Sequence, residues 1–479
     1  MLSPPDAPAP YRRMSVAPQA GPYRPETAIL SLGEAFYDPV EAADFPQTIL
    51  RFRNRRWAEA VGLDALGDEP WLRHFGRFEP LPDTLEQPLA LRYHGHQFRV
   101  YNPDIGDGRG FLFAQLRDGA GRLLDLGTKG SGQTPYSRFG DGRLTLKGGV
   151  REVLATEMLE ALGVETSKTF SLIETGEALQ RGDEPSPTRS SVLVRLQHSH
   201  IRIGTFQRLA FLGETDNLRR LTDYCLDHYF GEGGGAHAPE RLLGHVVDSA
   251  ARLAASYIAA GFVHGVLNSD NIAVTAQSFD YGPWRWTPYW DGGFTAAYFD
   301  HAGLYSFGRQ HEAIHWDLVQ LAASLRHIAP AEALTPALER FPAGFQQALR
   351  EAICARLGVA PRGEEPDNAL LAAIEDGLAA RTVTIDRFFF DWRGGGRRGP
   401  SPADAAYEDQ RFAGFRSLVR SYRPAAEPGH PYWSDDAPCS MHIDEVEAIW
   451  DRIDRDDDWT AFEAKIAALR RMGEAMASP

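Results

Sequence analysis

Cysteine is scarce in this chain of 479 residues, which holds only Cys225, Cys354 and Cys439, all far apart. That scarcity excludes a scaffold built on disulfides and a four-cysteine zinc or iron–sulfur site. Long hydrophobic runs are also missing, because none approaches the ~18 apolar residues that a membrane-spanning helix needs. The first residues lack the charged and then apolar pattern of a secretory signal. We therefore expect a cytoplasmic protein with no membrane partner.

Basic charge is in short supply as well, with 50 Lys and Arg residues against 65 Asp and Glu residues and a formal net charge of −15. General nucleic-acid binding needs a basic face, so we expect no nucleic-acid partner. Any site for an anion has to be built from local cations. The hydrophobic content of 43% is ordinary for a globular protein, and a chain of this length can bury a large core.

The composition along the chain predicts an α+β fold, with a sheet-rich half followed by a helical half. Short β-rich runs and frequent glycines mark the first half, and one amphipathic helix interrupts them at 149–162. We divide the chain into a disordered proline-rich arm (1–25), a helical N-terminal extension (26–87), a sheet-rich lobe (88–215), a helical lobe (216–393), and a linker with a C-terminal extension (394–479).

The densest chemical signal runs from His264 to Asn271 and continues at Asp280-Tyr281-Gly282. Protein kinases place a His-x-Asp-x-x-x-x-Asn loop before a strand, and an Asp-Phe-Gly motif comes after the short hairpin that follows. There the Asn and the second Asp hold Mg²⁺, a hard cation that prefers oxygen ligands. The spacing here favours a site for a nucleotide and a metal. The alternative is an Asx turn followed by an ordinary hairpin residue.

One part of the kinase pattern is absent. The catalytic-base Asp of kinases stands two residues after the His, and that position is Val266. A carboxylate does occur at Asp270, directly before Asn271. The two candidate metal ligands are therefore present, while the candidate base stands at a different position. This difference indicates that the acceptor group lies differently from the acceptor of an ordinary kinase.

A second signal lies in the sheet-rich half, at Gly106-Asp107-Gly108-Arg109-Gly110. Glycines let backbone N–H groups approach phosphates, but this run matches neither the Walker A pattern nor a strict G-x-G-x-x-G, and a hairpin turn explains it equally well. Lys129 follows a strand-like run, and Glu152 lies on the embedded helix 23 residues later. Kinases hold a strand lysine against phosphates with such a helix glutamate.

Further cations and turns accompany these motifs. Arg195 ends an apolar strand run and Arg202 follows shortly after it, so both either bind a polyphosphate or line a solvated strand edge. Asp141-Gly142-Arg143 is a turn by default and a candidate nucleotide contact. The pairs His94-x-His96 and His198-x-His200 have no further ligand at a convincing spacing, which disfavours a transition-metal site.

Long blocks of the sequence resemble the selenoprotein O / YdiU family of kinase-like protein nucleotidyltransferases. The blocks run in family order and are YHGHQF (93–98), NPDIGDGRG (102–110), TKGSGQTPYSRFGDGR (128–143), VLVRLQHSHIRIGTF (192–206), GFVHGVLNSDNIAV (261–274) and GLYSFGRQHEAIHWDLVQLAASL (303–325). The resemblance implies a bilobal protein-kinase-like fold and an adenylyltransferase that moves AMP from ATP onto Ser, Thr or Tyr hydroxyls of proteins, releasing pyrophosphate. It also implies an inverted ATP, with the γ-phosphate buried and the α-phosphate facing the acceptor.

The resemblance assigns roles to the residues singled out above. Asp270 is implied as the general base, Asn271 and Asp280 as ligands of Mg²⁺, and Glu152 as the partner of Lys129. The implied nucleotide contacts are Gly106, Gly108, Arg109, Lys129, Asp141, Gly142, Arg195, Arg202 and Asp280.

Three alternatives remain open from the sequence. UMP transfer with Mn²⁺ fits the same family. Phosphate transfer is a second alternative, against which Val266 argues. A non-catalytic pseudokinase that binds ATP is the third, against which the surviving metal ligands argue. The chain departs from the family pattern at Arg99, where a Gly is usual, and in lacking a Cys-x-x-Cys or Cys-x-x-selenocysteine ending.

Overall fold

The computed structural model describes residues 18–182, 184–425 and 429–477. Of the arm predicted to be disordered, residues 1–17 lie outside the described residues. For the rest of the arm the prediction is wrong, because the Gly21 N–H donates a hydrogen bond to the Glu59 carbonyl and Pro25 opens a strand that pairs with Leu116.

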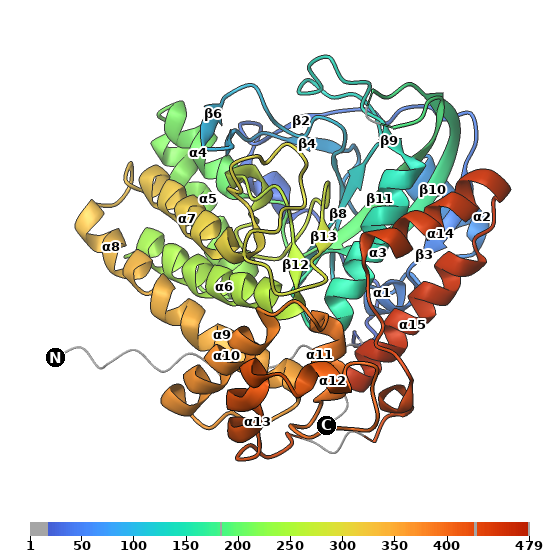
Figure 1. Ribbon diagram of the computed structural model, residues 1–479. Helices are drawn as coiled ribbons and strands as arrows, with labels where there is room; N and C mark the ends of the chain where they lie inside the picture. The colour runs from blue at the N-terminus through green and yellow to red at the C-terminus, as the bar shows by residue number, and fades with distance from the viewer. Residues whose placement is uncertain (1–17, 183, 426–428, 478–479) are drawn as a thin grey trace.

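An antiparallel sheet of nine strands dominates the first half of the chain (Figure 1). Its main path runs β2-β4-β7-β8-β11-β10-β3, with β1 paired to β7 and β9 paired to β11. The strands are β1 (Pro25–Glu26), β2 (Tyr37–Pro39), β3 (Ile49–Arg53), β4 (Leu89–Leu91), β7 (Leu112–Arg117), β8 (Leu123–Lys129), β9 (Leu144–Thr145), β10 (Lys168–Leu179) and β11 (Thr188–Gln197).

The prediction of a helical extension over 26–87 is wrong, because this segment contributes β2 and β3 to the two ends of the main sheet path. Only η1 (Ala28–Leu32), α1 (Arg55–Ala60) and α2 (Asp68–Gly76) are helical there. Edge strands need only one hydrogen-bonded neighbour and carry polar side chains on their open side. The sequence of β3, ILRFR, therefore lacks the continuous apolar pattern that would predict a strand.

The two faces of the sheet bury separate cores, because side chains alternate between faces along each strand. On β11, Val192 and Val194 join a cluster with Trp71 of α2, whereas Leu193 faces helix α3 (Leu146–Ala161). The helix begins three residues earlier than its sequence pattern predicts, because the Thr145 hydroxyl caps it by accepting the Gly148 N–H at 3.1 Å.

The second half of the chain is mainly helical and begins with α4. Figure 1 shows these helices, in green to orange, beside the sheet. They are α4 (Ile203–Phe211), α5 (Thr215–Phe230), α6 (Ala238–Ala260), α7 (Gln310–Leu325), α8 (Ala331–Glu339), α9 (Phe341–Leu357), α10 (Glu364–Leu378), α11 (Ile385–Asp391), α12 (Asp404–Tyr407) and α13 (Ala413–Val419). Within the described ranges, no helix combines the length and apolarity needed to cross a membrane.

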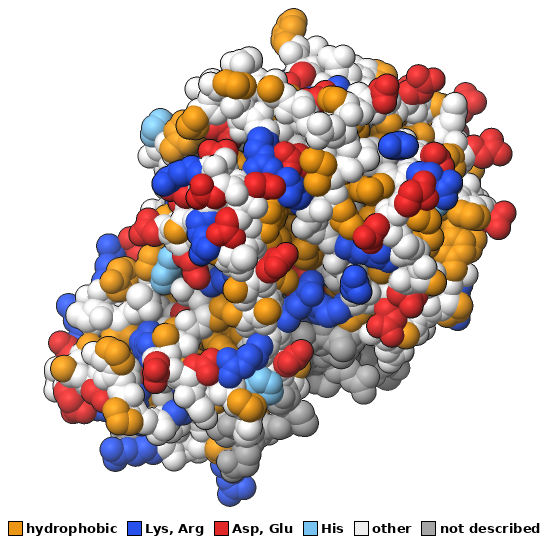
Figure 2. Space-filling view, turned by 90° about the vertical axis from the view of Figure 1, so that its right-hand side faces the viewer, with side chains coloured by type: hydrophobic (Ala, Val, Ile, Leu, Met, Phe, Trp, Pro, Cys, Tyr) orange, Lys and Arg blue, Asp and Glu red, His pale blue; other side chains and the backbone are white. Residues whose placement is uncertain are grey.

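The last two helices return to the sheet. In Figure 1, α14 (Ile443–Asp456) and α15 (Thr460–Ala477) lie beside α3. Both contact α3, and Arg470 of α15 donates to both carboxylate oxygens of Glu157 on α3 at 2.9 and 2.7 Å. This side of the molecule faces the viewer in Figure 2, where acidic and basic side chains are intermingled over the surface.

The resulting architecture is bilobal and α+β, as predicted. A sheet with one long helix forms the first lobe, and a helical bundle forms the second. Two small antiparallel strand pairs complete the fold, the hairpin of β5 (Gly95–Gln97) with β6 (Val100–Asn102), and β12 (Phe262–Val263) with β13 (Arg285–Trp286). The loop that joins β12 to β13 holds the sequence from His264 to Asp280, so the motif lies where the lobes meet.

Candidate active site

A pocket of about 730 Å³ opens between the two lobes. Every residue singled out as a nucleotide contact lines it, together with the candidate base. These residues are Gly106, Gly108, Arg109, Lys129, Asp141, Gly142, Arg195, Arg202, Asp270 and Asp280. Two of the other predicted residues, Glu152 and Asn271, do not line the pocket but lie next to residues that do. The structure thus brings together residues as far apart in the sequence as Gly106 and Asp280, which are separated by 174 positions.

The inner end of the pocket is a cluster of alternating charges. The Lys129 ammonium at the end of β8 lies 2.6 Å from a carboxylate oxygen of Glu152 and 2.9 Å from one of Asp280. The Arg195 guanidinium lies 3.7 Å from Glu152 and 3.4 Å from Asp280. Glu152 is only 1% exposed, so its charge is balanced by these two cations rather than by water.

Asp280 is held in its ionised form by its neighbours. Burial by itself raises the pKa of a carboxyl, but the Lys129, Arg195 and Arg109 cations outweigh that effect and hold the pKa of Asp280 well below its usual range. Its backbone has a φ of +63°, in the left-handed region that Asp tolerates better than most residues. Tyr281, the next residue, is anchored by hydrogen bonds with Thr166 and Ser278.

Asp270 has the opposite electrostatic environment. It belongs to a single 3₁₀ turn, η2 (Ser269–Asn271), and packs against hairpin β5–β6, where a Cβ on Gly95 would lie 2.9 Å from its carboxylate. Burial raises the pKa of Asp270 to about 6, and the nearby Arg202 cation opposes the shift only in part. Its buried Oδ1 accepts no hydrogen bond from the described residues. A carboxylate with this pKa is suited to accept a proton near neutral pH.

The loop that carries Asp270 is fixed from both sides. The His264 ring bonds through Nε2 to the Phe279 carbonyl at 2.9 Å, which joins the start of the loop to the residue before Asp280. Burial lowers the pKa of His264, so the ring is neutral and its Nε2–H donates. On the other side, the backbone of Ile203 bonds to Ile272.

The side-chain amide of Asn271 is oriented by one hydrogen bond. Its amide nitrogen donates to the carbonyl of Val266 at 3.0 Å, which leaves the amide oxygen as the atom available to a ligand. Val266 stands at the position where kinases carry their base, and here it supplies only this carbonyl. The described residues contain no cluster of three or more His, Cys, Asp or Glu side chains that could hold a metal by themselves.

Arg202 joins the loop that carries Asp270 to the glycine-rich turn at 106–110. It is 2% exposed, and its guanidinium donates to the Asp270 carbonyl at 3.0 Å and lies 3.4 Å from Asp107. Its charge also lies 4.0 Å from the centre of the Tyr93 ring, where the negative face of an aromatic attracts cations. The alternative interpretation of Arg202, as a residue on a solvated strand edge, is therefore wrong.

The glycine-rich turn at 106–110 lies under a second loop, 130–143. A Cβ on Gly106 would lie 2.5 Å from the Tyr136 ring, and one on Gly110 would lie 2.1 Å from the Thr128 carbonyl oxygen. These glycines therefore admit neighbouring parts of the protein, in addition to lining the pocket. The Ser137 hydroxyl donates to the Gly108 carbonyl at 2.6 Å and fixes the second loop over the turn.

Asp141 and Gly142 lie at the outer end of the pocket. The Arg181 guanidinium donates to both oxygens of Asp141 at 2.8 and 3.1 Å, which attaches the 130–143 loop to the turn after β10. Gly142 has a φ of +69°, and a Cβ there would lie 2.2 Å from the Gly132 carbonyl oxygen. The loop therefore requires glycine at this position.

Several pocket residues were missed by the sequence reasoning. These are Arg138, Phe139, Gln180 and Arg181, which line the outer end. The turn at Asp141-Gly142-Arg143 and the family block at 128–143 pointed to loop 130–143 without singling these four residues out. No local pattern distinguishes Arg181 from any other surface arginine, because its placement depends on the pairing of β10 with β11.

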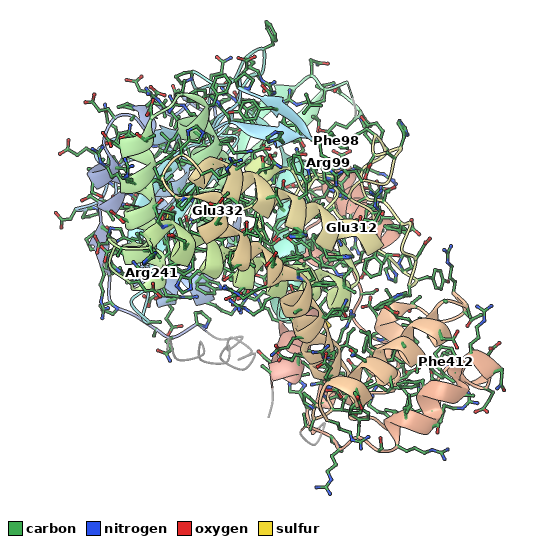
Figure 3. The ribbon with its side chains drawn as sticks, turned by 90° about the vertical axis from the view of Figure 1, so that its left-hand side faces the viewer. Phe98, Arg99, Arg241, Glu312, Glu332 and Phe412 are labelled. Atoms are coloured by element: carbon green, nitrogen blue, oxygen red, sulfur yellow. The ribbon has the colours of Figure 1, made fainter. Side chains whose placement is uncertain are left out.

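Hairpin β5–β6, which packs against the loop that carries Asp270, contains Arg99. Figure 3 shows Phe98 and Arg99 at the end of β5–β6, and both have positive φ, +50° and +63°. The Phe98 N–H donates to Asn268, two residues before Asp270. The Arg99 guanidinium lies 5.4 Å from the centre of the Trp316 ring on α7 and does not line the pocket. The interpretation of Arg99 as a change close to the phosphates therefore finds no support in the geometry.

A strand lysine paired to a helix glutamate, a His-to-Asn loop and a following Asp at one pocket define a protein-kinase-like nucleotide-binding fold. Residues 22–399 match the family model described as protein adenylyltransferase SelO. The chain is 40% identical to the protein nucleotidyltransferase YdiU of Synechocystis sp., over 93% of this chain and 97% of that protein, and 44% identical to that of Gloeobacter violaceus, over 93% and 95%. The chain belongs to the SelO/YdiU family of protein nucleotidyltransferases.

Among solved structures, the kinase domain of a rhoptry antigen from Toxoplasma gondii is similar over 56% of this chain and 84% of that domain, at 11% identity and a TM-score of 0.29. This similarity is too weak to support a conclusion about fold or function.

Proposed function

We propose that this protein transfers AMP from ATP to a Ser, Thr or Tyr hydroxyl of a protein substrate and releases pyrophosphate. The observation that carries the proposal is the pair of carboxylates at one pocket. Cations surround Asp280 and lower the pKa of its carboxyl, whereas Asp270 lies apart from that cluster and burial raises its pKa. One suits metal and phosphate binding, and the other suits proton transfer.

In the proposed mechanism, Asp270 accepts the proton of the acceptor hydroxyl. The hydroxyl oxygen then attacks the α-phosphorus, a new P–O ester bond forms, and the bond to the β-phosphate oxygen breaks. The electron pair leaves with pyrophosphate. Because Asp270 lies outside the inner cation cluster, an α-phosphate beside Asp270 puts the β- and γ-phosphates toward Lys129 and Arg195.

The residues present fit a divalent cation of the Mg²⁺ type. Mg²⁺ typically binds one or two protein oxygens and takes its remaining ligands from phosphates and water, so Asn271 Oδ1 and the Asp280 carboxylate form a sufficient protein set. When bound, the ion neutralises phosphate charge in the transition state. Asp280 is paired with Lys129 and Arg195 in this structure, and binding of a metal by Asp280 would leave those cations free to contact phosphates.

The cations at the inner end stabilise the leaving group in this proposal. Lys129 and Arg195 are placed by Glu152 before any substrate arrives, so their reorganisation during the reaction is small. Val266 offers no carboxylate at the position where a kinase would place a hydroxyl beside the γ-phosphate. That absence favours AMP transfer over phosphate transfer.

The products test this proposal. The protein is incubated with ATP, Mg²⁺ and a cell lysate, and pyrophosphate and ADP are measured separately. We expect pyrophosphate in proportion to the modified protein. We expect none from Asp280→Asn, and strongly reduced release from Asp270→Asn with ATP binding retained. ADP in proportion to modified protein would show a kinase, and full activity of Asp270→Asn would refute the base assignment.

A further inference from the structure

Phe139 is an exposed aromatic side chain at the mouth of the pocket. Its exposure is 107%, above that of every other large hydrophobic side chain in the described parts of the chain, and it nevertheless lines the pocket. A phenylalanine held in water on every side gains nothing from burial in the free protein. A side chain of this kind at a ligand site indicates a surface that becomes covered when the ligand binds.

The backbone around Phe139 is held in place although the ring is free. The Gly140 N–H donates to the Ser137 carbonyl at 2.7 Å, and the Gln133 side chain donates to the Gly140 carbonyl at 2.8 Å. Arg138, just before Phe139, has a φ of +53°, which marks a tight turn at a residue that is not glycine. Strained residues of this kind persist where the surrounding structure fixes them, and they cluster at ligand sites.

The direction of the nucleotide in the pocket follows from the proposed mechanism. The cations that contact the acidic cluster, Lys129 and Arg195, lie at the inner end with Asp280. If the β- and γ-phosphates lie there and the α-phosphate faces Asp270, the ribose and base extend toward the outer end. That end is formed by Arg138, Phe139, Gln180 and Arg181.

We infer that the Phe139 ring is the stacking surface for the nucleobase of the bound nucleoside triphosphate. This inference rests on the proposed function for the direction of the nucleotide. Every base has a π face, so stacking on phenylalanine tolerates purines and pyrimidines and holds the larger purine ring system more strongly. The residue thus supplies affinity for the nucleoside, whereas the inner cations supply affinity for the phosphates.

The test compares ligands that differ only in the nucleoside. Affinities for ATP, UTP and inorganic tripolyphosphate are measured by calorimetry in the presence of Mg²⁺, with the wild type, Phe139→Ala and Phe139→Tyr. We expect Phe139→Ala to lower the affinity for ATP roughly tenfold or more, to lower the affinity for UTP less, and to leave the affinity for tripolyphosphate unchanged. Phe139→Tyr keeps a ring and restores ATP affinity.

Phe211 provides a matched control, because it is a phenylalanine at the end of α4 that is 61% exposed and does not line the pocket. Phe211→Ala is expected to bind all three ligands as the wild type does. An unchanged ATP affinity in Phe139→Ala, or an equal loss for ATP and tripolyphosphate, would overturn the inference. Because only binding is measured, a protein that stacks the base on Phe139 yet transfers no AMP would refute the proposed function and leave this inference standing.

Discussion

At the scale of single residues, the site depends on two carboxylates that lie ten positions apart and have opposite properties. Burial dominates at Asp270 and raises its pKa to about 6, whereas cations dominate at Asp280 and hold its pKa well below its usual range. Environments that give two carboxyl groups such different pKa values are typical of an acid–base site. Each carboxylate therefore leads to its own expected behaviour.

The rate of transfer should depend on pH through Asp270. A base acts in its deprotonated form, so we expect the rate at saturating ATP to rise with pH and to level off above about pH 6. Steady-state rates measured across this range check the prediction. A rate that falls as pH rises from 5 to 7, or an identical profile in Asp270→Asn, would contradict it.

The same pKa predicts a stability effect. A carboxyl whose pKa is higher in the folded state, about 6 against a usual 3.8, destabilises the folded state once it ionises, and the loss is complete above pH 6. Asp270→Asn removes that charge, so we expect the free energy of unfolding at pH 7.5 to rise by about 2–3 kcal/mol. Chemical denaturation at pH 7.5 and pH 5 checks this, because the gain should shrink at the lower pH. A gain that is absent, or equal at both values, would count against a buried ionised Asp270.

At the scale of elements, helix α3 links the C-terminal extension to the active site. Its Glu152 faces Lys129, and its Glu157, which is 3% exposed, is held by Arg470 of α15 and by Arg56. The C-terminal helices therefore support the helix that positions the lysine. The boundary of that extension at about residue 394 stays a prediction.

Arg470→Ala should affect both stability and catalysis. It leaves Glu157 buried with less compensation, which we expect to cost about 1–3 kcal/mol of unfolding free energy. Because α3 also carries Glu152, we expect the KM for ATP to rise severalfold. Arg455→Ala is the matched control, since among the described residues Arg455 forms an ion pair only with the exposed Asp451 on its own helix. Equal effects of the two substitutions on the KM for ATP would show that α15 does not position α3.

The turn of hairpin β5–β6 offers a second test at this scale. Arg99 has a φ of +63°, a conformation that costs a residue with a Cβ about 1–2 kcal/mol. Arg99→Gly and Arg99→Ala both remove the contact with Trp316, but only glycine relieves the backbone. We expect the glycine variant to be the more stable by about 1 kcal/mol in thermal or chemical denaturation. Equal stability would indicate that the turn is unstrained.

Much of the element structure could be predicted from periodicity. Apolar residues at helical spacing over 241–260 predict a helix, and the structure has α6 there at Ala238–Ala260, ended by Gly261 with a φ of +70°. The β-rich runs at 111–118 and 190–197 predict strands, and they are β7 and β11 with ends shifted by one or two residues. The strands β2 and β3 could not be predicted, because edge strands have no continuous apolar pattern and their pairing is fixed by residues far along the chain.

At the scale of the whole molecule, an acidic protein contains a pocket rich in cations. The net charge is −15, yet seven Lys and Arg side chains line the pocket against four Asp side chains. The sequence reasoning singled out five of the seven cations, namely Arg109, Lys129, Arg143, Arg195 and Arg202, because motifs, turns or strand patterns flanked them. It missed Arg138 and Arg181, which reach the pocket only through the folding of loop 130–143 and the β10–β11 turn.

The central claim is that the α-phosphoryl group, and not the γ-phosphoryl group, moves to protein. The most direct measurement incubates the protein with Mg²⁺, a cell lysate and ATP labelled at either the α- or the γ-phosphate. We predict protein-bound label from α-labelled ATP alone, and its loss in Asp280→Asn. Label from γ-labelled ATP alone would contradict the account and show a kinase.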